Sequence, residues 1–278
     1  MKIWFIIATV LVLLGLLFFA AIMTATSWDF QKLSTASYET NTHLLTEDFH
    51  DLLLETNTAN ICLSLAEDGL PRVECYEKTN AKHTVSIENG RLSIRLSHTK
   101  KWYEYISINF ETPKITVYLP KDEYDTLSLK ASTGNISVSN ITAASLSLAV
   151  STGKVTASKL NLQGELKLHV STGRSFLTDV TCQRLVSDGN TGDITLKNVI
   201  ASERIEIERT TGDVTFDACD AAELDIETDT GAVTGSLLSE KVFLVETSTG
   251  RVNLPKTVSG GLCEIETTTG NVKLEILK

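Results

Sequence analysis

The chain has 278 residues, of which 42% are hydrophobic and only 6% aromatic, and its formal net charge at pH 7 is −10. This length is sufficient for a membrane anchor and one elongated domain. The negative charge argues against nucleic acid as a partner, because phosphate contacts require a basic surface.

The first feature is an apolar stretch from Ile3 to Met23 that only Thr9 interrupts. About 20 apolar residues in a helix cross a bilayer. A cleavable signal peptide is the competing interpretation, but a cut after Ala21 or Ala25 leaves a large residue three positions from the cleavage point. We predict an uncleaved transmembrane signal anchor. Lys2 favours an inside amino terminus, with the rest of a single-pass cell-membrane protein extracellular.

Four segments follow from composition and pattern: the anchor over 1–24, a polar tether over 25–48, an irregular N-terminal β capping region over 49–120, and regular repeats over 121–278. The capping region contains a degenerate coil with Ala59 at its corner. It also contains apolar alternation around Asn89-Gly90, which predicts a hairpin or another irregular coil. No comparable cap follows the last repeat, so we expect an open C-terminal edge that could support self-association.

The regular repeats are marked by the dipeptide Thr-Gly, which recurs every 19 or 20 residues. A fixed period of this length is typical of stacked repeats. We expect these glycines to be structural turn residues with φ > 0. They are Gly134, Gly153, Gly173, Gly192, Gly212, Gly231, Gly250 and Gly270.

Each unit carries apolar residues at five positions: seven and five before the glycine, and two, four and seven after it. The spacing of two is the strand period, so each unit is predicted to be a strand, a corner and a second strand. Stacked units then form a single-stranded β-solenoid, or β-helix, of about eight coils, which the crossover rule makes right-handed. Ser175 and Ser187 occupy core positions in the third unit, so we expect a bulge or slipped register there.

The segment Ile115–Lys121, together with Tyr124, Leu127, Leu129 and Ser132-Thr133-Gly134-Asn135-Ile136, resembles the bacterial putative-adhesin family of β-strand-repeat proteins. The likeness covers about residues 45 to 278. It implies a β-helix domain of unknown function in the cell envelope, often on a membrane anchor in Gram-positive bacteria and sometimes near envelope-stress systems. The family supplies no catalytic residues to transfer.

Four successive units place a glutamate four residues before the glycine: Glu208, Glu227, Glu246 and Glu266. These positions alternate with core positions, so the side chains point outward. Stacking would align them about 4.8 Å apart. The hypothesis is a face that binds cations, such as divalent metals, cationic peptides or amine-bearing envelope polymers. The alternative is a solvated acidic face that aids solubility.

Other chemistry is sparse in the sequence. The five histidines are scattered and are interpreted as solvated surface residues. Cys219 and Cys263 fall on core positions, while Cys62 and Cys75 could bridge in an oxidising compartment. No cofactor motif, nucleophile elbow, phosphate loop or zinc motif is present.

We therefore expect a non-catalytic, membrane-anchored extracellular protein, an adhesin or surface-interaction scaffold with an unidentified protein or envelope-polymer partner. The alternative is an accessory or regulatory component of envelope-stress sensing. A carbohydrate-active β-helix enzyme is a weaker alternative, because a sugar cleft needs aromatic subsites and Trp102 is the only tryptophan after the tether.

Overall fold

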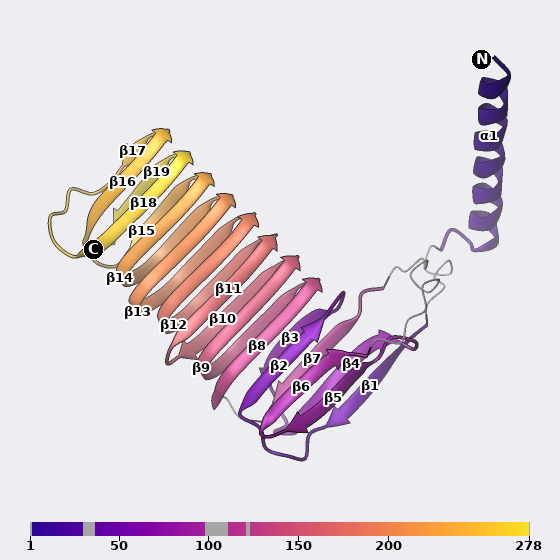
Figure 1. Ribbon diagram of the computed structural model, residues 1–278, viewed down its shortest axis with the longest axis horizontal. Helices are drawn as coiled ribbons and strands as arrows, with labels where there is room; N and C mark the ends of the chain where they lie inside the picture. Colours follow the sequence, from indigo (N-terminus) through magenta and orange to yellow (C-terminus); the bar gives the residue numbers. More distant parts are fainter. Residues whose placement is uncertain (1, 30–36, 98–110, 121–122, 278) are drawn as a thin grey trace.

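The computed structural model describes residues 2–29, 37–97, 111–120 and 123–277, in which one helix precedes a rod of nineteen β-strands (Figure 1). Trp102 and part of the predicted capping region lie outside the described residues. The β-solenoid predicted from the Thr-Gly period is confirmed, and its coils stack along the rod axis.

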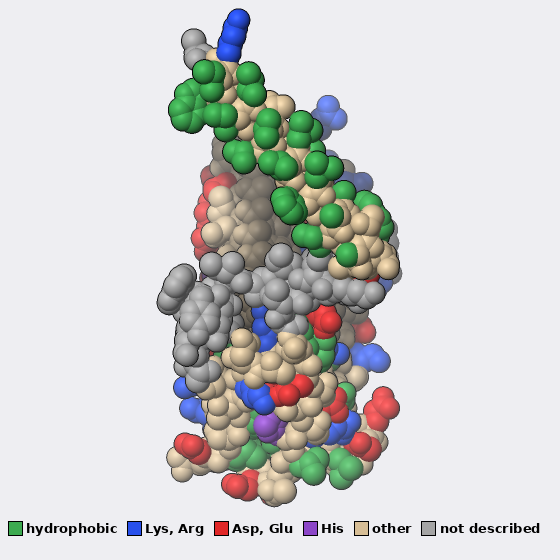
Figure 2. Space-filling model, turned by 90° about the vertical axis from the view of Figure 1, so that its right-hand side faces the viewer, with side chains coloured by type: hydrophobic (Ala, Val, Ile, Leu, Met, Phe, Trp, Pro, Cys, Tyr) green, Lys and Arg blue, Asp and Glu red, His purple; other side chains and the backbone are tan. Residues whose placement is uncertain are grey.

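Helix α1 (Lys2–Ala25) is exposed on every side except at Met23, and its mean hydropathy reaches 3.0. Figure 2 shows hydrophobic side chains along the side of this helix that faces the viewer. The hydroxyls of Thr9 and Thr24 donate to the backbone carbonyls of Phe5 and Ala20, so both polar groups are satisfied inside the helix. In the described part of the chain, this is the one helix long and apolar enough to be a membrane span or a signal sequence.

Each regular coil consists of strand segments that pair in parallel with the coils on either side. The continuous ladders place Leu146 beside Leu166 and Leu127, and Ile205 beside Leu185 and Leu224. The strands are β8 (Glu123–Thr133), β9 (Ile136–Thr152), β10 (Val155–Leu162), β11 (Glu165–Thr172), β12 (Ser175–Thr191), β13 (Ile194–Thr211) and β14 (Val214–Thr230).

A second corner follows six residues after the glycine, and it was not predicted from the sequence. The residue there has a φ of 51–57° in five coils. Asn and Asp tolerate this left-handed conformation better than most residues, so their recurrence could have indicated the corner. The five residues are Asn140, Lys159, Asp179, Asn198 and Ala218.

The alternation of 19 and 20 residues is absorbed at a third corner. Between β12 and β13 the register shifts only between Cys182 and Arg184, and between β13 and β14 only between Ala201 and Arg204. A 20-residue coil thus places its extra residue at this corner. All other positions stay aligned from β12 to β14.

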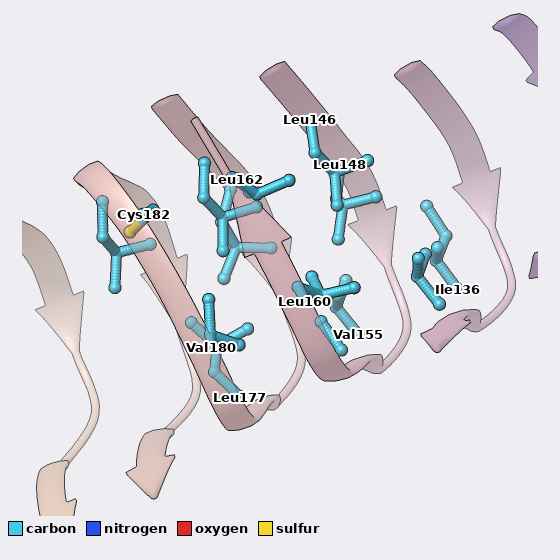
Figure 3. Packing of buried hydrophobic residues seen from close by; sticks show 14 of the residues in the cluster. Ile136, Leu146, Leu148, Val155, Leu160, Leu162, Leu177, Val180 and Cys182 are labelled. Atoms are coloured by element: carbon cyan, nitrogen blue, oxygen red, sulfur yellow. The ribbon is translucent and has the colours of Figure 1, made fainter. Parts of the chain in front are cut away.

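The five predicted apolar columns fill the interior, where the labelled side chains of Figure 3 point toward one another between the ribbons. Two further inward positions were not predicted. One lies nine residues after the glycine and holds Ala143, Leu162, Cys182, Ala201 and Ala221. The other lies three residues before it and includes Val150, Val170, Arg209, Thr228 and Thr267.

The predicted slip at Ser175 and Ser187 is wrong. Both serines are 1% exposed and stay in register, Ser175 with Ile194 and Ser187 with Ile207. The hydroxyl of Ser187 accepts a hydrogen bond from the buried guanidinium of Arg209. The Ser187 hydroxyl is therefore matched by a partner from the next coil, whereas the buried Ser175 hydroxyl has no hydrogen-bond partner among the described residues; neither serine shifts the register.

At the C-terminal end the spatial order of the coils departs from the chain order. The strands are β15 (Val233–Leu237), β16 (Lys241–Thr249), β17 (Val252–Asn253), β18 (Gly261–Thr269) and β19 (Val272–Ile276). β18 lies between β14 and β16, and β19 lies between β15 and β17. The coil of β16 and β17 is therefore outermost, and the last coil of the chain is inserted beneath it.

Three predictions for the C-terminal core are wrong, one because of this order and two because of a register shift. Val252 is 48% exposed because its coil, not the last one in sequence, forms the end of the stack. Leu238 and Leu277 are also exposed. Leu237 takes the buried place beside Cys219 and Ile276 instead, because the register shifts where these coils lack the left-handed second corner.

The N-terminal strands form a mixed parallel and antiparallel cap. They are β1 (Tyr38–Leu44), β2 (Asp51–Thr56), β3 (Asn60–Leu65), β4 (Arg72–Lys78), β5 (His83–Glu88), β6 (Arg91–Leu96) and β7 (Lys114–Leu119). β2 and β3 form a coil that pairs with the regular stack on one side and with β6 and β7 on the other. Antiparallel β5 and β4 close the end, and β1 pairs with β4.

Two predictions from the sequence concern this cap. The polar tether predicted over 25–48 is wrong for Tyr38–Leu44, which forms a strand that pairs with β4 through seven residues. This pairing covers an edge of β4 that would otherwise be open. The alternation around Asn89-Gly90 is a hairpin between β5 and β6, with φ of 52° and 73° at the two turn residues.

Candidate interaction surface

The Thr-Gly corners form a continuous ladder along the rod. The N–H of Gly153 donates to the carbonyl of Thr172 at 2.9 Å, and the N–H of Gly192 donates to that of Thr211 at 2.7 Å. A Cβ on Gly192 would lie 1.7 Å from the carbonyl oxygen of Gly173. Glycine is thus required here because neighbouring coils stack backbone against backbone.

A positive φ was predicted at all eight corner glycines but is found at only five of them. The first five corner glycines have φ between 129° and 154°, whereas Gly231, Gly250 and Gly270 are not in the left-handed region. At each of these three, a Cβ would still lie 1.8–2.0 Å from a carbonyl oxygen of the adjacent corner. Close approach of the coils is the feature that all eight corners share.

Next to this ladder, the four predicted glutamates lie in one column on the outer face. Direct register pairs join Glu208 to Glu227, Glu227 to Glu266, and Glu266 to Glu246. The spatial order therefore differs from the chain order, because of the inserted last coil. All four side chains are exposed. We call Glu208, Glu227, Glu266 and Glu246 the acidic column.

The acidic column borders a surface hollow of about 260 Å³, lined by residues of 227–229, 246–248 and 266–268. Desolvation, followed by the charges of Glu208 and Glu266, raises the pKa of Glu227. Like charges on directly opposed strands repel, and a cation between them would relieve that repulsion. The hollow is polar and open, which suits an ion or a charged side chain better than an apolar ligand.

A second acidic row beside the column is partly neutralised. Arg204 forms ion pairs with Glu206 at 3.3 Å and Glu223 at 3.1 Å, and it also binds Asp225. None of the ion pairs among the described residues involves the acidic column. Its charges are thus those left available to an external cation.

Cys219 and Cys263 are buried core residues, as predicted, but one histidine and the possible disulfide differ from the predictions. His83 is buried and bonded to Glu77, so the interpretation of every histidine as a solvated surface residue is wrong at this position. The five cysteines all lie in the described residues and are free thiols. Cys62 and Cys75 cannot bridge as placed: β7 separates their strands, and Cys75 points inward beside Ile115 whereas Cys62 lies beside Thr116.

The fold and this surface can be compared with known proteins. The profile of the Toastrack DUF4097 family matches residues 49–278. A crystal structure described as a putative adhesin from Bacteroides fragilis NCTC 9343 is similar, with a TM-score of 0.52 at 17% identity. The match covers 86% of this chain and 97% of that one.

A second solved structure is described as a putative lipid binding protein from Parabacteroides distasonis ATCC 8503. It has a TM-score of 0.39 at 13% identity, with 87% and 98% of the two chains covered. At these identities the structural likeness concerns the fold alone. A comparison with curated protein sequences gives no match.

Proposed function

The chain belongs to the Toastrack DUF4097 family, and we propose that it is a membrane-anchored, extracellular, non-catalytic scaffold of the bacterial cell envelope. In this role it acts as an adhesin or surface-interaction protein. The observation that carries the proposal is the junction of an exposed apolar helix, α1, to a rigid stack of coils with a regular outer face.

Helix α1 supports the membrane location. Among the described residues, its apolar side chains other than Met23 are exposed, and a bilayer is the environment in which such a helix is stable. The rod that follows has a continuous hydrogen-bonded backbone, so its surface residues keep fixed spacings. A stiff array of this kind suits the presentation of repeated contacts to a partner.

The location is tested with an epitope tag on the amino terminus of the full chain. Protease added to intact cells should remove the rod and leave a tagged membrane fragment. A matched variant, with 1–24 replaced by a cleavable signal peptide, should release the rod into the medium. Recovery of the wild-type rod from the medium, without its helix, would contradict the anchor.

The role is tested in a deletion strain. Complementation by the wild-type gene should restore surface attachment, and attachment should survive exchange of α1 for an unrelated membrane helix. Loss of resistance to envelope antibiotics without loss of attachment would favour the envelope-stress alternative. Dependence of that loss on the native sequence of α1 would point to contact with a membrane sensor.

We further propose that the acidic column is the contact surface for a cationic partner, either a divalent ion or a cationic peptide or polymer. The in-register alignment of its four carboxylates supports this. The melting temperature of the full chain should rise with added Ca²⁺, and the Glu227→Gln/Glu246→Gln variant should not show that rise.

The control for this experiment removes the same charge elsewhere. Glu88→Gln/Glu123→Gln changes two exposed carboxylates in the N-terminal half and should leave the Ca²⁺ response intact. If the ion has no effect, binding of a polylysine peptide is measured with the same variants. Equal behaviour of the two pairs with both probes would identify the column as a solvated face.

A further inference from the structure

A second group of ligand atoms lies inside the protein, at the capped end of the core. Cys75 and Glu77 on β4 and His83 at the start of β5 are buried, with exposed fractions of 0%, 1% and 7%. The thiol, carboxylate and imidazole atoms all lie within 4.8 Å of one another. A carboxylate and an imidazole are rare in such surroundings unless a partner holds them.

The strand pattern explains why these residues meet. Cys75 and Glu77 are two residues apart on one strand, so both point to the same face, together with the core residue Val73. β4 pairs with β7, whereas β5 pairs with β6. His83 therefore reaches the site from the opposite wall of the solenoid, and the three side chains bridge the two walls.

Surrounding hydrogen bonds hold the carboxylate and the ring in place. Asn41 Nδ2 donates to Glu77 Oε1 at 2.8 Å, and the backbone N–H of His83 donates to Glu77 Oε2 at 2.6 Å. His83 Nδ1 lies 2.7 Å from Glu77 Oε2, and His83 Nε2 lies 3.1 Å from Thr56 Oγ1. One proton lies between His83 Nδ1 and Glu77 Oε2, and donation of Nε2–H to the Thr56 hydroxyl directs Nδ1 toward this position. This is how outer partners orient histidine ligands in metal sites.

From this geometry we propose that Cys75, Glu77 and His83 form a binding site for a divalent transition-metal ion of the zinc type. Thiolate, imidazole and carboxylate are the three side-chain ligand classes of protein zinc. A thiolate and a carboxylate carry two negative charges, so a divalent ion makes the buried site neutral. The ion replaces the proton shared by His83 Nδ1 and Glu77 Oε2, and these atoms separate from 2.7 Å to about 3.3 Å to fit ordinary metal–ligand bonds.

Two consequences follow for binding. Metal binding displaces the thiol proton of Cys75 and the proton between His83 and Glu77, so two protons are released and the apparent affinity rises with pH. The sulfur and nitrogen ligands also disfavour Ca²⁺. The internal site is therefore chemically distinct from the acidic column on the surface. By joining the two walls, the metal stabilises the cap.

Cobalt(II) gives a direct readout, because a cobalt–thiolate bond produces a charge-transfer absorption band. The full chain in detergent, stripped with EDTA, should develop this band up to one equivalent of Co²⁺, and Zn²⁺ should abolish it. Cys75→Ser and His83→Gln should remove the band. Cys182→Ser, at another buried thiol, and Cys62→Ser, at the half-exposed thiol, should retain it.

The wild-type protein alone decides the matter if a variant fails to fold. Folded wild-type protein without a charge-transfer band after addition of Co²⁺ would overturn the proposal. So would a band that persists in folded Cys75→Ser, or one that disappears in Cys62→Ser. In the Glu227→Gln/Glu246→Gln variant, in which the acidic column should no longer respond to Ca²⁺, a rise in the melting temperature with Zn²⁺ but not with Ca²⁺ is the second expected result.

Discussion

The guanidinium of Arg209 donates a 2.7 Å hydrogen bond to the hydroxyl of Ser187, a core residue of the neighbouring coil. Arg209 is only 3% exposed, and it also donates to the carbonyl of Glu208. Space for it exists because Gly189 has no side chain: a Cβ there would lie 2.8 Å from Arg209 Nη1. Burial lowers the pKa of Arg209, and the nearby charge of Asp188 opposes that shift.

This pair predicts a strongly non-additive mutant cycle. Ser187→Val should cost about 2 kcal/mol, because it leaves a buried charged donor without its partner. Arg209→Met in that background should recover most of the loss, since an apolar pair of similar volume fits the column. Denaturant unfolding of both single variants and the double variant measures the coupling. Additive losses would show that the hydrogen bond contributes nothing.

Close approach of the coils predicts a second contrast between two glycines. Gly231→Ala should destabilise by about 2–3 kcal/mol, because its Cβ would lie 2.0 Å from the carbonyl oxygen of Gly212. Gly69 has a φ of 69°, but no atom lies within 4 Å of a Cβ added there. Gly69→Ala should therefore cost only backbone strain, about 1 kcal/mol. Thermal melts of the two variants compare the loss of stability from a clash between stacked coils with the loss from backbone strain alone. A milder effect at Gly231 than at Gly69 would contradict the stacked corners.

Repulsion in the acidic column predicts a pH-dependent gain for Glu227→Gln. Because the folded-state pKa of Glu227 is raised, folding favours its protonated form, and that advantage is lost as the pH rises through the folded value. At pH 7 the variant should therefore be more stable by a few tenths of a kcal/mol, roughly the size of an exposed charge interaction. The gain should vanish below the ordinary pKa of 4.5 and shrink with salt. Melts from pH 3 to 7 test this, and a gain that persists at pH 3 would disprove the origin in charge.

Burial of four cysteines predicts a single fast-reacting thiol. It raises the pKa of Cys75, Cys182 and Cys263 to about 12, and raises that of Cys219. The thiolate is the reactive form, so only the half-exposed Cys62 should react with maleimide in the native protein at pH 7. Mass spectrometry identifies the site, and all five should react in denaturant. Rapid labelling of Cys182 in the native protein would contradict the burial of this thiol in the core.

The repeats could be predicted from sequence because each core column comes from one apolar position that recurs at a fixed distance from the glycine in successive coils. Leu127, Leu146 and Leu166 share one position before the glycine and one place in the core. The exceptions could not be predicted in the same way. Ser187 depends on Arg209, which lies 22 residues away, and this pairing is visible only once the coils are stacked.

The ends and the sites show the same limit. Nothing in the local pattern of Glu246 or Glu266 distinguishes the outermost coil from the inserted one, because both carry the same repeat. The outward direction of the acidic column followed from strand alternation alone. The Cys75, Glu77 and His83 cluster was missed because its residues approach across two walls, and only the inward alternation of Val73, Cys75 and Glu77 could have indicated it.

The most direct test of the account is the order of the coils in the acidic column. In a Cys62→Ser background, Glu227→Cys/Glu266→Cys should form a disulfide under mild oxidation, because these residues are register partners on adjacent strands. Glu227→Cys/Glu246→Cys should not, because β18 lies between them. Non-reducing peptide mapping measures both. A disulfide in the second pair but not in the first would show that the coils follow chain order and would contradict the insertion of the last coil.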